Sequence, residues 1–136
     1  MKSGWAIEYI GIPWSDRGRT RAGVDCYGLL WLVLSEQFGV SVPSYAENYA
    51  TAIDKEEVGA LMRGELLTPR WSKVADAEAR AGDGIMISLS GLPYHVGVVV
   101  DPPYFLNVLR GTACALERWT SPRWNRRVEG FYRYAG

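Results

Sequence analysis

The amino-acid sequence predicts an α+β fold in which N-terminal helices precede an antiparallel β-sheet. The segment Leu29–Leu34 has no polar residue on any face, which is typical of a buried helix. After Gly82-Asp83-Gly84 the chain consists of short runs rich in β-branched residues, separated by turns. Helices followed by strands indicate the α+β class. Because 136 residues suffice for one core, we expect residues 1–136 to form one domain.

The first half of the chain predicts three helices. A short one over Trp5–Ile10 is ended by Gly11-Ile12-Pro13-Trp14. The core helix begins after Asp25, whose carboxylate can cap it, and ends before Gly39, a residue typical of the position just past a helix. The polar and basic segment Ser15–Ala22 between them predicts a loop over a functional site at the start of the core helix.

The third helix begins after Asp54. Glu57 follows three residues later, which is the spacing of a capping box. Val58, Leu61 and Met62 then form one apolar face. No chemistry is expected from this helix.

The second half predicts a series of strands joined as an antiparallel meander. The turns between them are expected at Ser90–Pro93 and Asp101–Pro103, and Trp119–Arg126 is expected to be irregular. The expected strands are Trp71–Val74, Ile85–Leu89, His95–Val100, Tyr104–Leu109, Ala113–Arg118 and Val128–Tyr134.

Cys26 is the candidate nucleophile because it lies in the first turn of the core helix. The unpaired N–H groups and the positive dipole end at this place stabilise a thiolate, so we expect a lowered pKa. The alternative is a small core residue, since free cysteine is often buried. Cys114 is expected to be a buried structural residue, because a bridge to Cys26 would consume the nucleophile.

His95 is the only histidine, 69 residues after Cys26. Imidazole can take the proton from a thiol and return it to a leaving amine near neutral pH. The alternative is a structural histidine with satisfied hydrogen bonds. A single histidine also leaves no cluster with zinc-ligand spacing, so we expect no metal and no cofactor.

The segment Asp25-Cys26-Tyr27-Gly28 before an apolar helix resembles the nucleophile motif of the NlpC-type peptidases. These are papain-like cysteine hydrolases of bacterial cell-wall peptide. Pro93-Tyr94-His95-Val96-Gly97 resembles the His-x-Gly strand of that family, and Gly11-Ile12-Pro13-Trp14 its Gly-x-Pro-Tyr element. The resemblance implies a helix carrying Cys26 packed on a sheet carrying His95.

The family places a polar residue on the next strand to orient the imidazole, and Asn107 matches that position. If Asp101–Pro103 form a three-residue loop, Val100 pairs with Tyr104, and Asn107 lies diagonal to His95 on the same face. A loop of two or four residues would turn Asn107 to the opposite face. The alternative is an asparagine that caps local backbone groups.

The resemblance also implies substrate contacts. In the family, the aspartate and serine beside the nucleophile help recognise the free amine of a stem peptide, and the tyrosine of Gly-x-Pro-Tyr borders the site. Asp25, Tyr27 in place of the serine, and Trp14 in place of the tyrosine are therefore the candidate substrate-binding residues.

The net charge of zero gives no global field that favours nucleic acid. Arginines nevertheless gather before the nucleophile and near the C-terminal end. Either they form solvated or ion-paired surface, or they form a basic rim for an anionic polymer. The residues concerned are Arg17, Arg19 and Arg21, then Arg118, Arg123, Arg126, Arg127 and Arg133.

Four further segments resemble those of tail-associated cell-wall peptidases of phages. They are Trp14–Arg19, Pro43-Ser44-Tyr45, Ser121–Trp124 and Gly130–Arg133. No secretory signal or apolar membrane span is visible. We therefore expect synthesis in the cytoplasm and delivery to the cell wall by a phage tail.

The expected function is a cysteine (thiol) peptidase or amidase acting on peptidoglycan stem peptides, with Cys26, His95 and Asn107 as the catalytic triad. Phage tail proteins are the other expected partners, and neither nucleic acid nor a membrane is expected. Two alternatives remain open: a non-catalytic module of a phage tail, and a papain-like acyltransferase on another amide.

Overall fold

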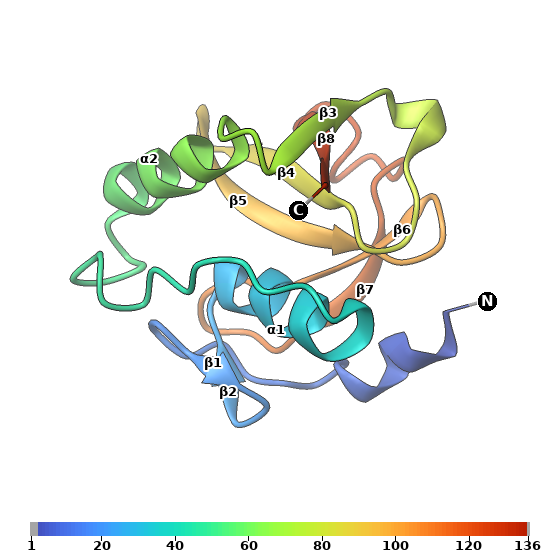
Figure 1. Cartoon of the computed structure of the whole chain (residues 1–136). Helices are drawn as coiled ribbons and strands as arrows, with labels where there is room; N and C mark the ends of the chain where they lie inside the picture. Colours follow the sequence, from blue (N-terminus) through green and yellow to red (C-terminus); the bar gives the residue numbers. More distant parts are fainter. Residues whose placement is uncertain (1–2, 136) are drawn as a thin grey trace.

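The structure is a computed structural model that describes residues 3–135. Two helices and a six-stranded sheet make its body, and Figure 1 shows α1 and α2 on the same side of the sheet. The elements are 3-10 helices Gly4–Glu8 and Asp76–Glu78, helices α1 Cys26–Phe38 and α2 Lys55–Leu66, and strands β1 Arg19–Thr20, β2 Gly23–Val24, β3 Trp71–Val74, β4 Gly84–Leu89, β5 Leu92–Val99, β6 Tyr104–Asn107, β7 Ala115–Arg118 and β8 Val128–Tyr134. The α+β prediction is confirmed.

The main sheet is antiparallel, with strand order β3-β8-β4-β5-β6-β7. Strands β4 to β7 form the expected meander. Strand β8 does not continue it, because the chain returns across Trp119–Arg127 and inserts β8 between β3 and β4. The expectation of a simple meander was wrong, since local pattern identifies a strand but not its non-local partner.

Helix α1 forms as the sequence predicts. The Asp25 carboxylate accepts a hydrogen bond from the Gly28 N–H at 2.8 Å, and the chain leaves the helix through Gly39 at φ 63°. The left-handed conformation at this position is open to glycine without a steric penalty. Most of α1 is buried against β5, which explains its apolar sequence. Cys26 is thereby held at the first position of a core helix.

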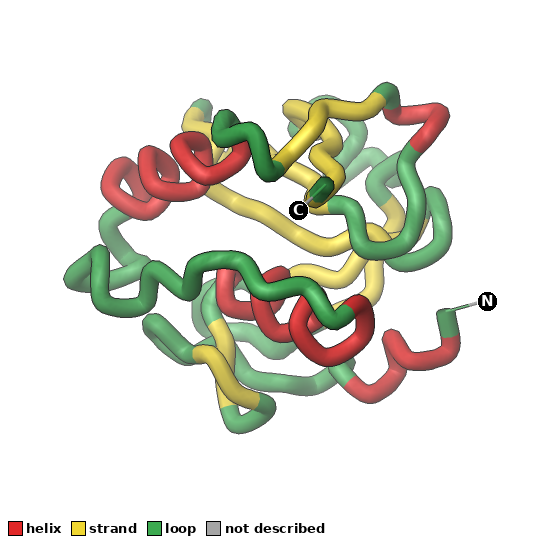
Figure 2. Tube along the Cα trace, in the orientation of Figure 1, coloured by secondary structure: helices red, strands yellow, loops and turns green. Residues whose placement is uncertain are grey.

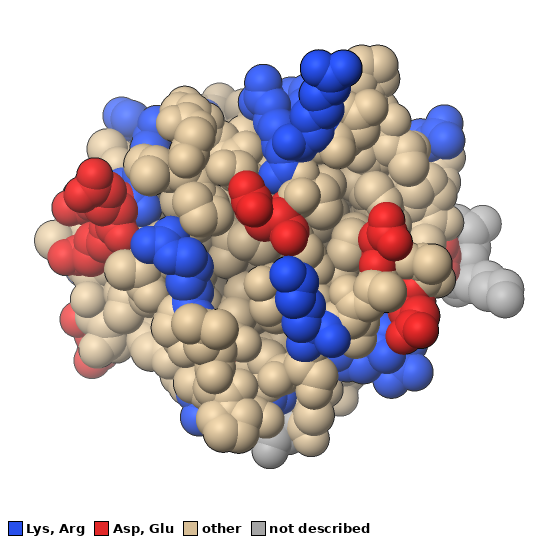
Figure 3. Space-filling view, turned by 90° about the horizontal axis from the view of Figure 1, so that it is seen from above, with Lys and Arg blue, Asp and Glu red and all other residues tan. Residues whose placement is uncertain are grey.

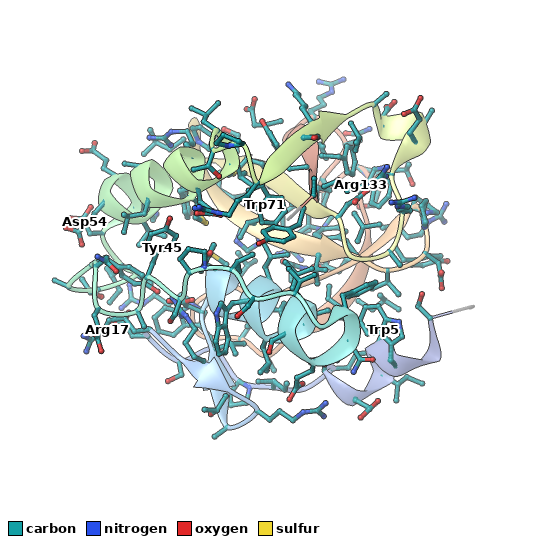
Figure 4. All side chains as sticks on the ribbon, viewed as in Figure 1. Trp5, Arg17, Tyr45, Asp54, Trp71 and Arg133 are labelled. Atoms are coloured by element: carbon teal, nitrogen blue, oxygen red, sulfur yellow. The ribbon has the colours of Figure 1, made fainter. Side chains whose placement is uncertain are left out.

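Helix α2 begins after Asp54, whose carboxylate accepts from the Glu57 N–H at 3.0 Å. The expected capping box is only half formed, because the Glu57 carboxylate accepts from the Ala50 N–H instead. Figure 4 shows Asp54 at the outer end of the helix, where the long segment between α1 and α2 arrives. This segment, residues 39–54, contains no helix or strand and crosses the molecule beside α1 (Figure 2).

The turn before β5 is shorter than the sequence predicts. Ser90 and Gly91 alone make it, both with positive φ, and the strand already begins at Leu92. Pro93 is accommodated because the pairing of β4 with β5 shifts register after Ile87. Residue His95 therefore lies inside β5 rather than at its start.

The pairing of β5 with β6 follows the register expected for a three-residue loop. Val98 pairs with Leu106 and Val99 with Phe105, and the Val100 N–H donates to the Tyr104 carbonyl. This register prediction is confirmed. It directs His95 and Asn107 to the same face of the sheet.

Candidate active site

A cavity of about 270 Å³ lies between the start of α1 and strand β5. Cys26 and His95 both line it, and so does Trp14, one of the three expected substrate-binding residues. The other lining residues are Ala52, Ile53, Lys55, Val58, Tyr94, Val108, Leu109 and Arg110. A larger surface hollow of about 610 Å³ beside β3 and β8 contains neither Cys26 nor His95. The smaller cavity is therefore the candidate active site.

The Cys26 thiol lies almost out of reach of solvent, with 8% of the residue exposed. Its sulfur is 3.9 Å from the Tyr94 carbonyl oxygen, next to His95 in the chain. Burial and the neighbouring Asp25 charge raise the pKa of the thiol to about 12. The expected lowering of this pKa is thus wrong for this structure, because desolvation outweighs the hydrogen bonds at the start of the helix.

The His95 imidazole is buried, with 2% of the residue exposed. Its Nε2 atom lies 3.1 Å from Oδ1 of Asn107, and the ring of Trp124 stacks on it with ring centroids 6.1 Å apart and an interplanar angle of 17°. Burial lowers the pKa of His95 to about 4. At pH 7 the thiol and the imidazole are therefore both neutral, and a proton must pass between them before the sulfur can attack.

Asn107 is buried on β6 and also contacts the next strand. Its Nδ2 group donates to Oε2 of Glu117 at 2.7 Å, and Arg123 pairs with the other oxygen of Glu117 at 3.2 Å. Sequence reasoning missed Glu117 and Trp124. Glu117 pairs with Phe105 across β6 and β7 and so is diagonal to Asn107, a relation that needs the register of β7.

Asp25 does not line the cavity, and its carboxylate is already fully engaged. It accepts from the N–H groups of Gly28 and Arg17, from Arg19 Nη1 at 2.9 Å, and from the Tyr49 hydroxyl. The structure therefore gives Asp25 an internal cation in place of a substrate amine. The expectation that Asp25 contacts substrate is not supported by this geometry.

Tyr27 is also outside the cavity. Its side chain is buried, its hydroxyl donates to the Pro43 carbonyl at 2.7 Å, and its ring packs edge-on against Tyr45. Tyr27 thereby tethers the segment after α1, and its expected contact with substrate stays a prediction. Of the three expected substrate-binding residues, only Trp14 faces the cavity.

The segment Ser15–Ala22 was expected to be a loop over the site, but none of it lines the cavity. Residues 15–18 form a turn, and Arg19–Ala22 supply β1 and the turn of the small β1–β2 hairpin beside α1. Arg19 anchors this hairpin, because its guanidinium bonds the Ser44 carbonyl, Tyr49 and Asp25. This role of Arg19 was missed because two of its partners, Ser44 and Tyr49, lie 25 and 30 residues away in the chain.

Four of these eight arginines are ion-paired with carboxylates of residues 3–135. Arg19 pairs with Asp25, Arg21 with Glu36, Arg123 with Glu117 and Arg133 with Asp83. Basic and acidic side chains are interspersed over the face seen in Figure 3. This favours the interpretation of these residues as ordinary surface over a continuous basic rim.

Both cysteines are free, and Cys114 is buried as expected. Within residues 3–135, no group of three or more metal-ligating side chains comes together. In the same part of the chain, no helix has the length and apolar character that crossing a bilayer requires.

A cysteine at the start of a core helix and a histidine on a facing antiparallel sheet define a papain-like α+β protein. The model of the NlpC/P60 family matches residues 11–133, and the chain belongs to this family. Members of the family are cysteine peptidases.

The chain is similar to "Murein DD-endopeptidase MepS/Murein LD-carboxypeptidase" of Escherichia coli strain K12, at 21% identity over 120 residues. The match covers 88% of this chain and 54% of that protein, so the chain spans about half the length of this relative.

Solved structures show the same fold. The NlpC/p60 domain of the peptidoglycan hydrolase SagA superposes with a TM-score of 0.58 at 18% identity, covering 94% of this chain and 92% of that one. An NlpC/P60 family protein of Bacillus cereus gives a TM-score of 0.67 at 17% identity, covering 94% and 37% of the two chains.

Proposed function

We propose that this protein is a cysteine hydrolase that cleaves an amide bond in bacterial peptidoglycan stem peptides. The observation that carries the proposal is the shared cavity of Cys26 and His95, with His95 held by Asn107 at 3.1 Å. The named activities of the relatives, a murein endopeptidase and a peptidoglycan hydrolase, support the choice of substrate class.

In the proposed reaction His95 acts first as base and then as acid. Nδ1 of His95 takes the proton of the Cys26 thiol, and the sulfur attacks the amide carbonyl carbon. The carbonyl oxygen gains negative charge near the start of α1, where backbone N–H groups lack helical acceptors. The imidazolium then protonates the leaving amine, which leaves a thioester on Cys26.

Water completes the cycle. His95 takes a proton from a water molecule, the hydroxide attacks the thioester carbonyl, and the Cys26 sulfur leaves and is reprotonated. In this mechanism Asn107 accepts from His95 Nε2–H throughout, which leaves Nδ1 as the ring nitrogen that exchanges protons with the sulfur.

The test compares two cysteine variants on purified peptidoglycan and on synthetic stem peptides. We expect Cys26→Ala to release no new amine or carboxyl ends above background, because Cys26 carries the one thiol among the residues that line the cavity with His95. Cys114→Ser is the matched control, since Cys114 is buried away from the cavity. Product release by Cys26→Ala at the parent rate would reject the proposal.

Transfer to an amine is a competing outcome of the same thioester. Adding an amine such as hydroxylamine and identifying the products by mass spectrometry separates hydrolysis from acyl transfer. Hydrolysis gives a free carboxylic acid, whereas acyl transfer gives the adduct of the acyl group with the added amine. An excess of this adduct over the free acid, already at low amine concentration, would favour a papain-like acyltransferase.

We also propose that a phage tail carries the protein to the cell wall. The support is the resemblance of Trp14–Arg19 and Gly130–Arg133 to tail-associated peptidases. A non-catalytic tail module is the second candidate, favoured by the engagement of Asp25 with Arg19. Mass spectrometry of purified virions tests the location, and normal infectivity of a phage carrying Cys26→Ala would favour the tail module.

A further inference from the structure

The charged residues that line the active-site cavity are both cationic. Lys55 enters from the start of α2 and Arg110 from the segment after β6, and among the described residues no carboxylate lines the cavity. Within residues 3–135, neither cation has a carboxylate oxygen within 4.0 Å. A cavity beside the nucleophile thus holds two positive charges that form no ion pair with a carboxylate from this part of the chain.

The place of Lys55 is unfavourable for the helix itself. Lys55 is the first residue of α2, where the dipole disfavours a positive charge. Its ammonium lies 5.3 Å from the centre of the Tyr94 ring, which also lines the cavity. A cation that weakens its own helix yet faces the cavity indicates a role in binding.

The nearby acids form no ion pair with these two cations. Asp16 lies within electrostatic reach of Arg110 and offsets part of its charge, but its oxygens accept from Thr51 and the Ala52 N–H rather than from Arg110. Burial alone would raise the pKa of Asp16, and those hydrogen bonds with the Arg17 and Arg110 charges hold it below its usual range. The other acid beside the nucleophile, Asp25, is paired with Arg19 outside the cavity.

We propose that Lys55 and Arg110 form a subsite for a free carboxylate of the substrate, adjacent to the scissile amide. This inference rests on the proposed hydrolase function and narrows its substrate class to anionic peptides. Charge-assisted hydrogen bonds from both cations would hold the carboxylate, while Trp14 and Tyr94 supply the apolar wall. With Asp25 engaged, an amine gains no comparable partner among the described residues of the cavity.

The experiment uses pairs of stem peptides that differ only in one carboxylate, free in one member and a carboxamide in the other. For the pair that differs at the carboxylate bound by the subsite, we expect kcat/KM to be about tenfold or more lower for the carboxamide peptide than for the carboxylate peptide. In the double variant Lys55→Gln/Arg110→Gln the two members should be cleaved at similar rates. Arg80→Gln is the control, because it removes one positive charge at an exposed site away from the cavity.

Binding provides a readout that does not need catalysis. Titration calorimetry on Cys26→Ala should give tighter binding of the carboxylate peptide, and higher salt should reduce the difference. Equal binding of both members, or full discrimination in the double variant, would overturn the subsite. A binding preference without cleavage by the parent would instead reject the hydrolase function and leave the subsite standing.

A second inference comes from the hydrogen bonds behind His95. Glu117 accepts from Asn107 at 2.7 Å, and an ionised carboxylate can only accept, so the Asn107 NH₂ group must face Glu117. The Asn107 carbonyl oxygen therefore faces His95 Nε2, which must carry the proton. The neutral imidazole then has its lone pair on Nδ1, the atom that must accept from Cys26.

We infer that Glu117 is a positioning residue that selects the catalytic tautomer of His95 through Asn107. Arg123 fixes Glu117 by its ion pair and lies over the ring of Trp124, 4.8 Å from the guanidinium carbon to the ring centre. Trp124 in turn stacks against His95. The Glu117 carboxylate thereby sets the orientation of Asn107 and His95, two members of the expected triad.

The single histidine makes the tautomer directly measurable by ¹⁵N NMR. We expect the parent to show Nε2–H at pH 7, and Glu117→Ala to show a mixture of tautomers with kcat reduced at least tenfold and KM little changed. Glu117→Gln should recover part of the activity, because its amide oxygen can still accept from Asn107. An unchanged tautomer and unchanged kcat in Glu117→Ala would overturn the inference, and the NMR result stands even without hydrolase activity.

Discussion

His95 is buried and is the only histidine of the chain, so its protonation is coupled directly to folding. Its pKa is about 4 in the folded protein and 6.5 in the unfolded chain. The unfolded chain therefore binds the proton more readily below pH 6.5. The contribution of neutral His95 is present above pH 6.5 and is lost as the pH falls toward 4.

Denaturant unfolding of the parent and of His95→Gln across this range tests the coupling. We expect the parent to lose about 3 kcal/mol more stability than the variant between pH 7 and pH 4. The carboxylates titrate alike in both proteins, so the difference between the two curves reports His95. Parallel curves would show that His95 titrates near its ordinary pKa.

The Arg19–Asp25 pair is the least exposed of the ion pairs among the described residues, since the side chains of Arg19 and Asp25 are only 10% and 1% exposed. Removing Arg19 leaves the Asp25 charge without its cation, so Arg19→Met should lower the free energy of unfolding by about 3 kcal/mol. Arg21→Met is the matched control. Arg21 pairs with Glu36 at the surface, and its loss should cost less than about 1 kcal/mol. Equal effects of the two variants would contradict the structural role given to Arg19.

Local chemistry made several of these residues predictable. Asp25, Cys26 and Gly39 follow from capping rules, because a helix end draws its partners from its own neighbours. The environment of Cys26 did not follow, since its burial comes from β5 and the surrounding loops. Tyr27 and Asp25 find partners in Pro43 and Tyr49, which only the folded chain brings near.

At the scale of the elements, strands β5 and β6 approach each other closely at Gly97. A Cβ atom there would lie 2.7 Å from the Leu106 carbonyl oxygen and 2.8 Å from the Phe105 ring. Gly97→Ala would push β6, which carries Asn107, away from His95. We expect the free energy of unfolding to fall by about 2 kcal/mol. The variant should stay folded at room temperature but lose most of its activity.

Gly64→Ala is the control for this variant. Gly64 is exposed in α2, and a Cβ atom at this position would meet no neighbouring atom within 4 Å. Alanine there should raise the free energy of unfolding by about 0.5 to 1 kcal/mol, because glycine is a poor helix former. Thermal unfolding of both variants gives the comparison, and a stable, fully active Gly97→Ala would show that the strands can separate without harm.

The elements themselves were largely predictable, because period and turn chemistry are local. Val128–Tyr134 agrees with β8, and the loop of Asp101–Pro103 correctly placed Asn107 on the face of His95. The hairpin β1–β2 was missed, since two-residue strands leave no periodic pattern. The turn at Ser90–Gly91 was placed too long because Pro93 suggested that the strand had not begun.

At the scale of the whole molecule, β8 joins the two parts of the sheet. It lies between β3 and β4, and Phe131 on it is 2% exposed and packs against Trp119. Figure 4 shows Trp71 of β3 directed into the interior, on the far side of β8 from β4. The C-terminal strand therefore completes a core that earlier strands cannot close.

Phe131→Ala should lower the free energy of unfolding by about 3 to 5 kcal/mol, because a buried ring leaves a cavity. Leu67→Ala is the control, since Leu67 is 84% exposed and its truncation should change stability by no more than about 0.5 kcal/mol. Chemical denaturation of both variants checks the difference. A small effect of Phe131→Ala would mean that β8 contributes little to the core.

The sequence by itself determined the α+β class, the nucleophile helix, the strands of the main sheet and the pairing register that places Asn107 on the face of His95. Each depends on residues a short distance apart, where capping, periodicity and loop length act. Tertiary structure alone decided the insertion of β8, the engagement of Asp25 by Tyr49, the positive lining of the cavity and the desolvation that keeps Cys26 and His95 neutral. These arise from contacts between distant segments, whose energies depend on burial and distance that no local pattern encodes.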